Sequence, residues 1–424
     1  MTRRLGKVGA VLGTALSLFA AGAKADEGAK LEVKGISGRA TTGVSIEYDH
    51  WSMRNTVGLA PKGNYEGMLP SLHMVGEFFR ANDVVEQRGD ETSHYTTAGF
   101  MIPDMKLGSL NSTFLAGGAA GDVRGFYAES INTLGDFTLT GTVSHRDFPG
   151  RATHFGGGLD WQVSDGFMIG GGFDTVKERV ELADEEGNPY YEDQRTNQFL
   201  GRATWDIDEH NRLAGAFVHV EEPDNTDTNT VSGYWMNYGN PVGWRFEGAA
   251  TWNNDRDFES YSGQFTISQN PTNEKDWSKW LIGRGAREWD QYYRGVVPTT
   301  IGESDGLVLM DWVNPNGALA RVGFVHTNDG LNTNDELYGS VGYVWGNPKD
   351  GRFGLIGNTA YTADKFPTFD DGGTHNGFDR DSQWYLGGEL GYQKGNWSVG
   401  AGVNVPMNGD DRYATFGLTA QVSF

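Results

Sequence analysis

The segment from Trp277 to Pro298 stands apart because it mixes basic and aromatic side chains. The cluster at its centre consists of Trp280, Arg284, Arg287, Trp289 and Arg294. Guanidinium groups bind carboxylates or phosphates bidentately, and flat aromatic faces stack on sugar rings. The cluster could therefore guide an anionic saccharide. The alternative is an aromatic girdle with ordinary charges at its rim.

A second set of charged residues recurs at the polar positions of alternating segments elsewhere in the chain. Its members are Arg202, Arg245, Glu247, Arg321, Asp160 and Glu389. If these positions share one face of a curved sheet, the residues form a constriction whose field sorts solutes by charge. The alternative is that they hydrate that face and pair across strands.

Acidic stretches suggest a third kind of site. Asp255, Asp257 and Glu259 are close in sequence, as are Asp370, Asp371, Asp379 and Asp381. Carboxylate oxygens are the ligands that Ca²⁺ prefers, although neither stretch has the spaced twelve-residue pattern of an EF-hand. The alternative is a solvated anionic rim that attracts cations through its field. No other cofactor is expected.

Enzyme motifs are missing from the sequence. We find no G-x-S-x-G, no H-E-x-x-H and no phosphate-binding loop, and the chain has no cysteine to act as a nucleophile or thiolate ligand. Ser144 and His145 are adjacent on an expected strand, so their side chains point to opposite faces. We therefore expect no catalytic activity.

Composition narrows the class of protein further. A net charge of −22 argues against nucleic-acid binding, which needs a basic surface. Aromatic residues make up 12% of the chain, with 62 Gly and only 13 Pro, which favours many short strands over a disordered coil. Two classes remain, a soluble all-β protein and a transmembrane β-barrel.

Periodicity favours the barrel. Apolar residues alternate with polar ones in segment after segment, for example at Phe199, Ala203 and Trp205 or at Trp397, Val399 and Ala401. Aromatic rings tend to stand at the ends of each apolar face, with small aliphatic residues between them. Lipid-facing strands have this pattern, because aromatic rings prefer the headgroup level. The sequence therefore predicts an all-β, transmembrane antiparallel β-barrel.

The last thirteen residues, Arg412 to Phe424, alternate strictly and end on a bare aromatic side chain. This stretch resembles the C-terminal strand of Gram-negative outer-membrane β-barrels of the porin type. The resemblance implies that Phe424 is the membrane insertion signal read by the barrel assembly machinery. In size and in its arginines the chain also resembles, weakly, alginate-export barrels.

The first 25 residues have a basic start, an apolar run from Val8 to Ala21 and an Ala23-Lys24-Ala25 cleavage pattern. This order is typical of a secretory signal peptide, and the apolar run is shorter than the ~20 residues of a spanning helix. We expect residues 26–424 to form the barrel, without a separate plug domain.

Connections of two kinds interleave along the chain. The short kind is turn-like: Asn132–Gly135, Ser164–Gly166, Gly239–Val242, Gln269–Asn273, Asn314–Gly317, Gly346–Gly351 and Lys394–Asn396. The longer kind is acidic: Glu181–Asp193, Glu221–Asn229, Asn253–Glu259, Asp290–Asp305, Asp364–Asp381 and Met407–Asp411. Short periplasmic turns opposite long extracellular loops are typical of these barrels.

The strand count is less regular in the N-terminal third of the chain. Alternation is weak over Leu107–Ala116 and Val123–Ile131. Counting every candidate segment gives an odd number of strands, so we expect one segment in this region to be wrongly assigned. The prediction is about 18 strands, in a range of 16 to 20.

A barrel of this width can hold an aqueous lumen. The leading hypothesis is an outer-membrane channel for small hydrophilic solutes or ions. The alternatives are an exporter of an anionic polysaccharide and a plugged barrel acting as a receptor, adhesin or scaffold. The expected partners are outer-membrane lipid, lipopolysaccharide, the barrel assembly machinery and small solutes, with a homo-oligomer possible and no nucleic acid.

Overall fold

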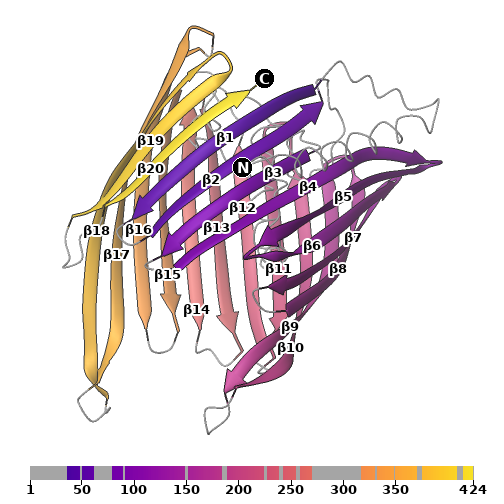
Figure 1. Ribbon diagram of the computed structural model, residues 1–424, viewed down its shortest axis with the longest axis horizontal. Helices are drawn as coiled ribbons and strands as arrows, with labels where there is room; N and C mark the ends of the chain where they lie inside the picture. Colours follow the sequence, from indigo (N-terminus) through magenta and orange to yellow (C-terminus); the bar gives the residue numbers. More distant parts are fainter. Residues whose placement is uncertain are drawn as a thin grey trace.

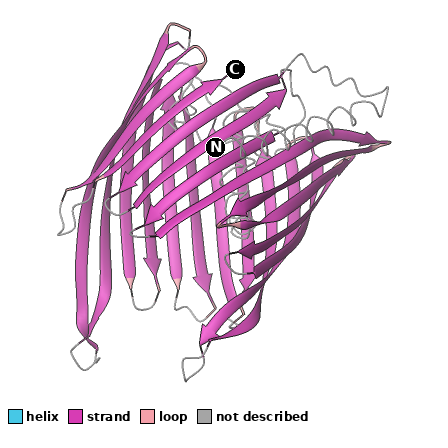
Figure 2. Cartoon of the chain, in the orientation of Figure 1, coloured by secondary structure: helices cyan, strands magenta, loops and turns pink. Residues whose placement is uncertain are grey.

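The computed structural model describes residues 36–47, 50–61, 79–88, 91–148, 151–183, 189–223, 227–237, 242–254, 258–269, 317–329, 332–347, 349–369, 375–407 and 414–423. Every regular element in these ranges is a β-strand (Figure 2). In this part of the chain, no helix is long and apolar enough to cross a membrane.

Twenty strands are present in the described residues, at the upper limit of the predicted range. They are β1 (Ile36–Glu47), β2 (His50–Pro61), β3 (Phe79–Arg88), β4 (Glu91–Leu107), β5 (Leu110–Gly121), β6 (Arg124–Leu134), β7 (Phe137–Phe148), β8 (Arg151–Ser164), β9 (Phe167–Ala183), β10 (Pro189–Asp206), β11 (Asn211–Glu221), β12 (Asp227–Asn237), β13 (Val242–Asn253), β14 (Glu259–Gln269), β15 (Gly317–Asn328), β16 (Thr333–Asn347), β17 (Gly351–Phe369), β18 (His375–Lys394), β19 (Trp397–Pro406) and β20 (Thr415–Ser423).

Each strand pairs antiparallel with the strand that follows it, and β20 pairs in the same way with β1. Val44 of β1 lies opposite Leu418 of β20, and Thr41 lies opposite Gln421. The pairings therefore form a closed circuit, and the ribbon curves into a barrel (Figure 1). Closure leaves no edge strand whose backbone N–H and C=O groups lack partners.

Side chains alternate between the two faces of this sheet, and the two faces differ in chemistry. One face exposes large apolar residues, among them Phe246, Val341 and Leu418, which are 55%, 65% and 60% exposed. The other face carries the polar partners of the alternation, many of them buried. The exposed apolar face is the outer wall, and its chemistry suits lipid rather than water. The prediction of an all-β transmembrane barrel is confirmed.

We call the end of the barrel that holds Ile36 and Ser423 the terminus end, and the opposite end the loop end. Except between β2 and β3 and between β14 and β15, short turns join the strands at the terminus end, including the two-residue turns at Gly135 and Gly395. Both glycines have φ near 58°, in the left-handed region that favours glycine (57° and 58°). The predicted short connections that begin at Asn132, Ser164, Gly239, Gly346 and Lys394 all lie at this end.

One part of the predicted topology is wrong. The sequence predicts separate turns at Gln269–Asn273 and Asn314–Gly317, with an outer loop at Asp290–Asp305 between them. In the structure β14 pairs directly with β15, for example Thr266 with Arg321. Both turns therefore belong to a single connection, residues 270–316, which leaves and rejoins the sheet at the terminus end.

The predicted acidic loops are also shorter than expected, because the strands continue into them. Glu181–Asp193 lies largely within β9 and β10, where Arg179 pairs with Asp193. Asp364–Asp381 lies largely within β17 and β18. These two hairpins extend furthest at the loop end (Figure 1). A strand that has left the lipid can be polar on both faces, so its sequence resembles that of a loop.

The weak segments of the N-terminal third are strands. Leu107–Ala116 falls mostly in β5 and Val123–Ile131 in β6, contrary to the expectation that one of them is misread. Glycine-rich stretches pair here because the neighbouring strand supplies bulk: a Cβ on Gly117 would meet the ring of Tyr127 at 2.6 Å. The glycines on one strand thus leave space for a large side chain on the next strand.

Candidate channel lumen

Asp160 and Arg202 face the lumen from β8 and β10 and bind each other across β9. The Nε of Arg202 donates to Oδ1 of Asp160 over 2.8 Å, and a second nitrogen contacts Oδ2. Gly170 lies between them in register, and a Cβ there would stand 1.8 Å from Oδ1 of Asp160. Glycine on the middle strand is therefore what allows the pair to form. The Arg202 side chain remains 26% exposed.

A neighbouring pair has the same design. Nε2 of His154 on β8 lies 2.6 Å from Oδ1 of Asp174 on β9, and both side chains are only 1% exposed. The carboxylate lies over Gly156, whose Cβ would be 1.6 Å from Oδ1. Burying an ionisable pair to this degree is costly unless the partners stay together. The pair therefore holds β8 and β9 in register at this level of the wall.

Arg245 and Glu247 form a third group, with partners that sequence reasoning did not single out. The two side chains contact each other along β13. Nε2 of Gln264 on β14 donates to Oε1 of Glu247 over 2.8 Å, and the hydroxyl of Tyr338 on β16 donates to Oε1 of Gln264 over 3.0 Å. A network thus runs across four strands. In the sequence, Gln264 could be recognised as part of this network only because it occupies a polar position in the alternation of β14.

Arg245 and Arg321 also share a row of the inner wall. Arg245 lies opposite Thr266 on β14, and Thr266 lies opposite Arg321 on β15. Glu389 faces inward from β18, opposite Gly402, away from these groups. The structure therefore brings together Arg202 with Asp160, and Arg245 with Glu247 and Arg321. It leaves Glu389 separate.

Several inward side chains are shielded from water, although the barrel is wide. Met236, Val344 and Arg245 are 0%, 0% and 1% exposed. Around twenty strands, wall side chains alone do not reach across the lumen. The inner wall between β12 and β16 is therefore covered at this level. Arg245 packs within the wall, whereas Arg202 meets open space.

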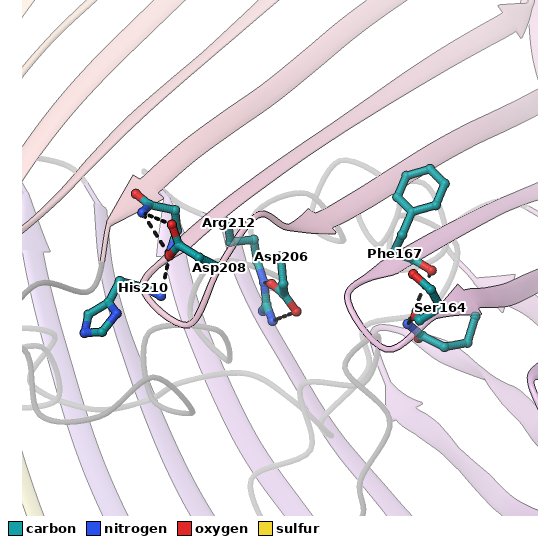
Figure 3. Close-up of polar contacts among 8 residues, drawn as sticks. Ser164, Phe167, Asp206, Asp208, His210 and Arg212 are labelled. Carbon is teal, nitrogen blue, oxygen red and sulfur yellow. Dashed lines mark hydrogen bonds and ion pairs between the residues drawn. The ribbon is translucent and has the colours of Figure 1, made fainter.

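The turn between β10 and β11 lies at the terminus end and carries two groups of polar contacts (Figure 3). Nη2 of Arg212 donates to Oδ2 of Asp206 over 2.9 Å. Beyond this pair, the carboxylate of Asp208 accepts hydrogen bonds from the backbone amides of His210 (2.7 Å) and Asn211 (2.8 Å). The bond from His210 and then those from Asn211 hold the pKa of Asp208 below its usual value. The short connections predicted from the sequence do not include this turn, which Asp208 could have indicated.

Other predicted sites lie outside the described residues. The basic-aromatic cluster of Trp280, Arg284, Arg287, Trp289 and Arg294 belongs to the connection 270–316, and Phe424 follows the last described residue. The Ca²⁺ hypothesis rests mostly on residues 255–257 and 370–374, which are likewise outside. Among the described ranges, no group of three or more His, Asp or Glu residues could hold a metal ion.

Comparisons with known proteins give structural likeness only. No family model matches the chain. No curated protein matches it either. Among solved structures, it is similar to Pseudomonas aeruginosa OpdQ, at 10% identity and a TM-score of 0.47, over 92% of this chain and 96% of that one. It is similar to P. aeruginosa OccK10 (OpdN) at 9% identity and a TM-score of 0.47, over 91% and 98%. It is also similar to the P. aeruginosa outer membrane protein OpdK at 10% identity and a TM-score of 0.41, over 92% and 98%.

Proposed function

We propose that this protein is a non-enzymatic channel in the outer membrane of a Gram-negative bacterium, through which small hydrophilic solutes or ions diffuse. The observation that carries the proposal is the closed antiparallel sheet with an exposed apolar outer wall and a charged inner wall. Among sheets, only a closed one satisfies every backbone hydrogen bond within lipid. The polar inner wall does not contact lipid, so its side chains line the interior of the barrel.

The charged pairs of the inner wall set the field that a solute meets. Arg202 is a member of the predicted constriction whose charged side chain is 26% exposed, while its partner Asp160 is 9% exposed and holds it in place. A guanidinium held by a carboxylate still presents donors to a passing anion. We infer that this pair acts in selectivity, and that the shielded Arg245 and Glu247 support the wall.

A second candidate is a barrel whose lumen is occluded for most solutes. The shielding of Met236, Val344 and Arg245 favours it. Such a barrel would act as a receptor or scaffold, or would pass only solutes that fit a narrow path. The export of an anionic polysaccharide, by contrast, rests on the basic-aromatic cluster and gains no support from the described residues.

Partners follow from the proposed location. Lipid and lipopolysaccharide would surround the outer wall, and the assembly machinery would read the C-terminal strand ending at Phe424. A polar row on the outer wall further supports contact with a second copy of this chain. Its members lie in register across four strands: Thr42, Asn55, Asp83 and Thr96.

This polar row interrupts an otherwise apolar wall. The hydroxyl of Thr42 donates to Asn55 over 3.0 Å, and Nε2 of His94 lies 2.8 Å from Oδ1 of Asp83. A carboxylate facing lipid near mid-height is destabilising. Six strands about 4.8 Å apart, along a band about 25 Å tall, offer roughly 700 Å². A standard interface buries about 600 to 1,000 Å² per partner, so the area of β1 to β6 falls within that range.

The test is single-channel recording with purified, folded protein in a planar bilayer. Under the proposal, the current rises in discrete steps, and a salt gradient gives a reversal potential that shifts in the Arg202→Gln variant. The matched control is Lys349→Gln, a charge change in an exposed turn at the terminus end. Folded protein that inserts and never conducts would favour the occluded barrel over the channel.

A further inference from the structure

The outer wall of β8, β9 and β10 changes character in layers from one end of the barrel to the other. Near the terminus end, Trp161, Ile169 and Trp205 face outward, and further along come Phe155, Phe173 and Phe199, all at least 37% exposed. Nearer the loop end, the outward positions become basic: Arg151, Lys177, Arg179 and Arg195. We call these four residues the basic wall patch.

Within the basic wall patch, like charges stand directly opposite one another. Arg151 pairs in register with Arg179, and Lys177 pairs with Arg195. Like charges at opposed positions of a sheet destabilise the pairing. This arrangement is conspicuous in a chain whose net charge is −22. An anion bound between the opposed cations would remove the repulsion.

The patch has some internal partners, and they leave most of its charge in place. Nζ of Lys177 lies 2.7 Å from Oδ2 of Asp193, and both side chains are more than half exposed. Nε of Arg195 donates to the hydroxyl of Thr175 over 3.0 Å, a neutral partner. The guanidinium of Arg179 lies 5.0 Å from the ring centre of Tyr191. Among the described residues, Lys177 is the one member of the patch with a carboxylate at ion-pair distance.

The height of the patch indicates what it meets. Ten residues separate Phe167 from Lys177 along β9. At about 3.3 Å per residue and a tilt near 40°, the rise is roughly 25 Å, which equals the height of the apolar band in such barrels. The Lys177 row therefore lies one band height from the terminus end, at the headgroup level of the opposite leaflet.

We propose that the basic wall patch binds the phosphate groups of a phosphorylated lipid in the leaflet at the loop end. This inference rests on the membrane location in the proposed function and adds a ligand to the outer wall. Arginine binds phosphate bidentately and lysine as a point charge, and anionic lipids attract such clusters. The acyl chains of the same lipid would lie along Phe155, Phe173 and Phe199.

The experiment titrates the detergent-solubilised full-length barrel with a diphosphorylated glycolipid (lipid A) and counts bound lipid by native mass spectrometry. The Arg151→Gln/Arg179→Gln variant loses about tenfold in affinity, equivalent to about 1.4 kcal/mol. The control variant, Lys349→Gln/Lys394→Gln, makes the same change in charge at the terminus end and retains wild-type affinity. Heat-modifiable migration on gels verifies that each variant is folded.

Two further arms identify the source of the phosphate. The dephosphorylated lipid binds wild type at least as weakly as lipid A binds the variant, and inorganic phosphate at the same concentration leaves lipid A bound. Equal binding of lipid A to wild type and the Arg151/Arg179 variant would overturn the proposal, as would displacement by inorganic phosphate. Channel recording on the same samples reports separately on the proposed function, since these residues lie outside the lumen.

Discussion

Arg202 on β10 reaches across Gly170 on β9 to bind the carboxylate of Asp160 on β8, although the pair is separated by 42 positions in the chain. The three residues form one row of the inner wall. The middle strand has to be bare at this point, since a Cβ on Gly170 would overlap Asp160. In the proposed channel, selectivity would thus depend on the missing side chain at Gly170 as well as on the two charges.

Separating this pair by substitution measures how strongly its members are coupled. In a double-mutant cycle with Asp160→Asn and Arg202→Gln, we expect a coupling free energy of about 1 to 3 kcal/mol, because both groups are mostly withdrawn from water. Urea unfolding in detergent micelles, followed by tryptophan fluorescence, provides the four free energies. Additive effects of the two substitutions would show that the ion pair does not stabilise the wall.

The role of the bare position predicts a difference between two glycines. Gly170→Val should force the Asp160 carboxylate away from Arg202 and shift the reversal potential in the same direction as Asp160→Asn. Gly201→Ala is the control, because a Cβ there meets nothing within 4 Å. If both variants conduct with wild-type selectivity, Gly170 has no part in positioning the pair.

The shielded network around Glu247 predicts unequal losses of stability. Glu247→Gln removes the carboxylate that Arg245 contacts in a buried site, at an expected cost of roughly 3 kcal/mol. Tyr338→Phe removes one donated hydrogen bond and should cost about 1 kcal/mol. Tyr343→Phe, on the exposed outer wall, serves as the control and should change the free energy of unfolding little. A reversed order of the first two variants would contradict the network.

The turn after β10 predicts a pH dependence with a definite sign. Hydrogen bonds from His210 and Asn211 favour the charged form of Asp208, so its pKa in the folded protein lies below the ordinary 3.8. Its stabilising effect on the turn is present above that ordinary value and is lost as pH falls through the lower folded pKa. The backbone amide of His210 should titrate in NMR spectra with a midpoint below 3.8, and Asp208→Asn should abolish the transition. A midpoint at or above 3.8 would reverse the sign.

The polar row on the outer wall predicts an effect on assembly. Asp83→Ala should reduce the oligomeric fraction measured by light scattering in mild detergent while the barrel stays folded. Asp335→Ala is a matched control, because Asp335 also binds a histidine on the outer wall, His326 at 2.7 Å, close to the loop end. An unchanged oligomeric fraction, or a monomeric wild type, would refute contact through β1 to β6.

The sequence predicted an antiparallel barrel and, for many strands, which residues face outward and which face inward. Strict alternation, as at Trp397 to Val405, identified the outer wall correctly. When one face of a strand contacts lipid, a two-residue period assigns the apolar side chains to that face. The inward charges at Asp160 and Arg202 followed from the same parity. The pairing of Asp160 with Arg202 could not be predicted in the same way. Which residue lies opposite another two strands away depends on the strand register, and the register depends on the lengths of the turns between the strands.

The errors had physical causes as well. The polar segment Glu181–Asp193 resembles a loop in sequence, although most of it continues strands β9 and β10. Asn-Pro pairs are typical of hairpin turns, so the sequence predicted two separate turns between β14 and β15, whereas these strands pair directly. The shielding of Arg245 could not be predicted, because the alternation of residues along a strand contains no information on what covers its inner face.

Alternate residues of each strand should contact lipid on one face and the barrel interior on the other. Because the chain has no cysteine, single cysteines can be introduced along β19 in the folded, bilayer-inserted protein and labelled with a nitroxide. Positions Val399, Ala401 and Val403 should collide most with lipid-dissolved oxygen, and Ser398, Gly402 and Asn404 most with a water-soluble nickel chelate. Equal access of the chelate to both sets would contradict a closed, membrane-spanning barrel.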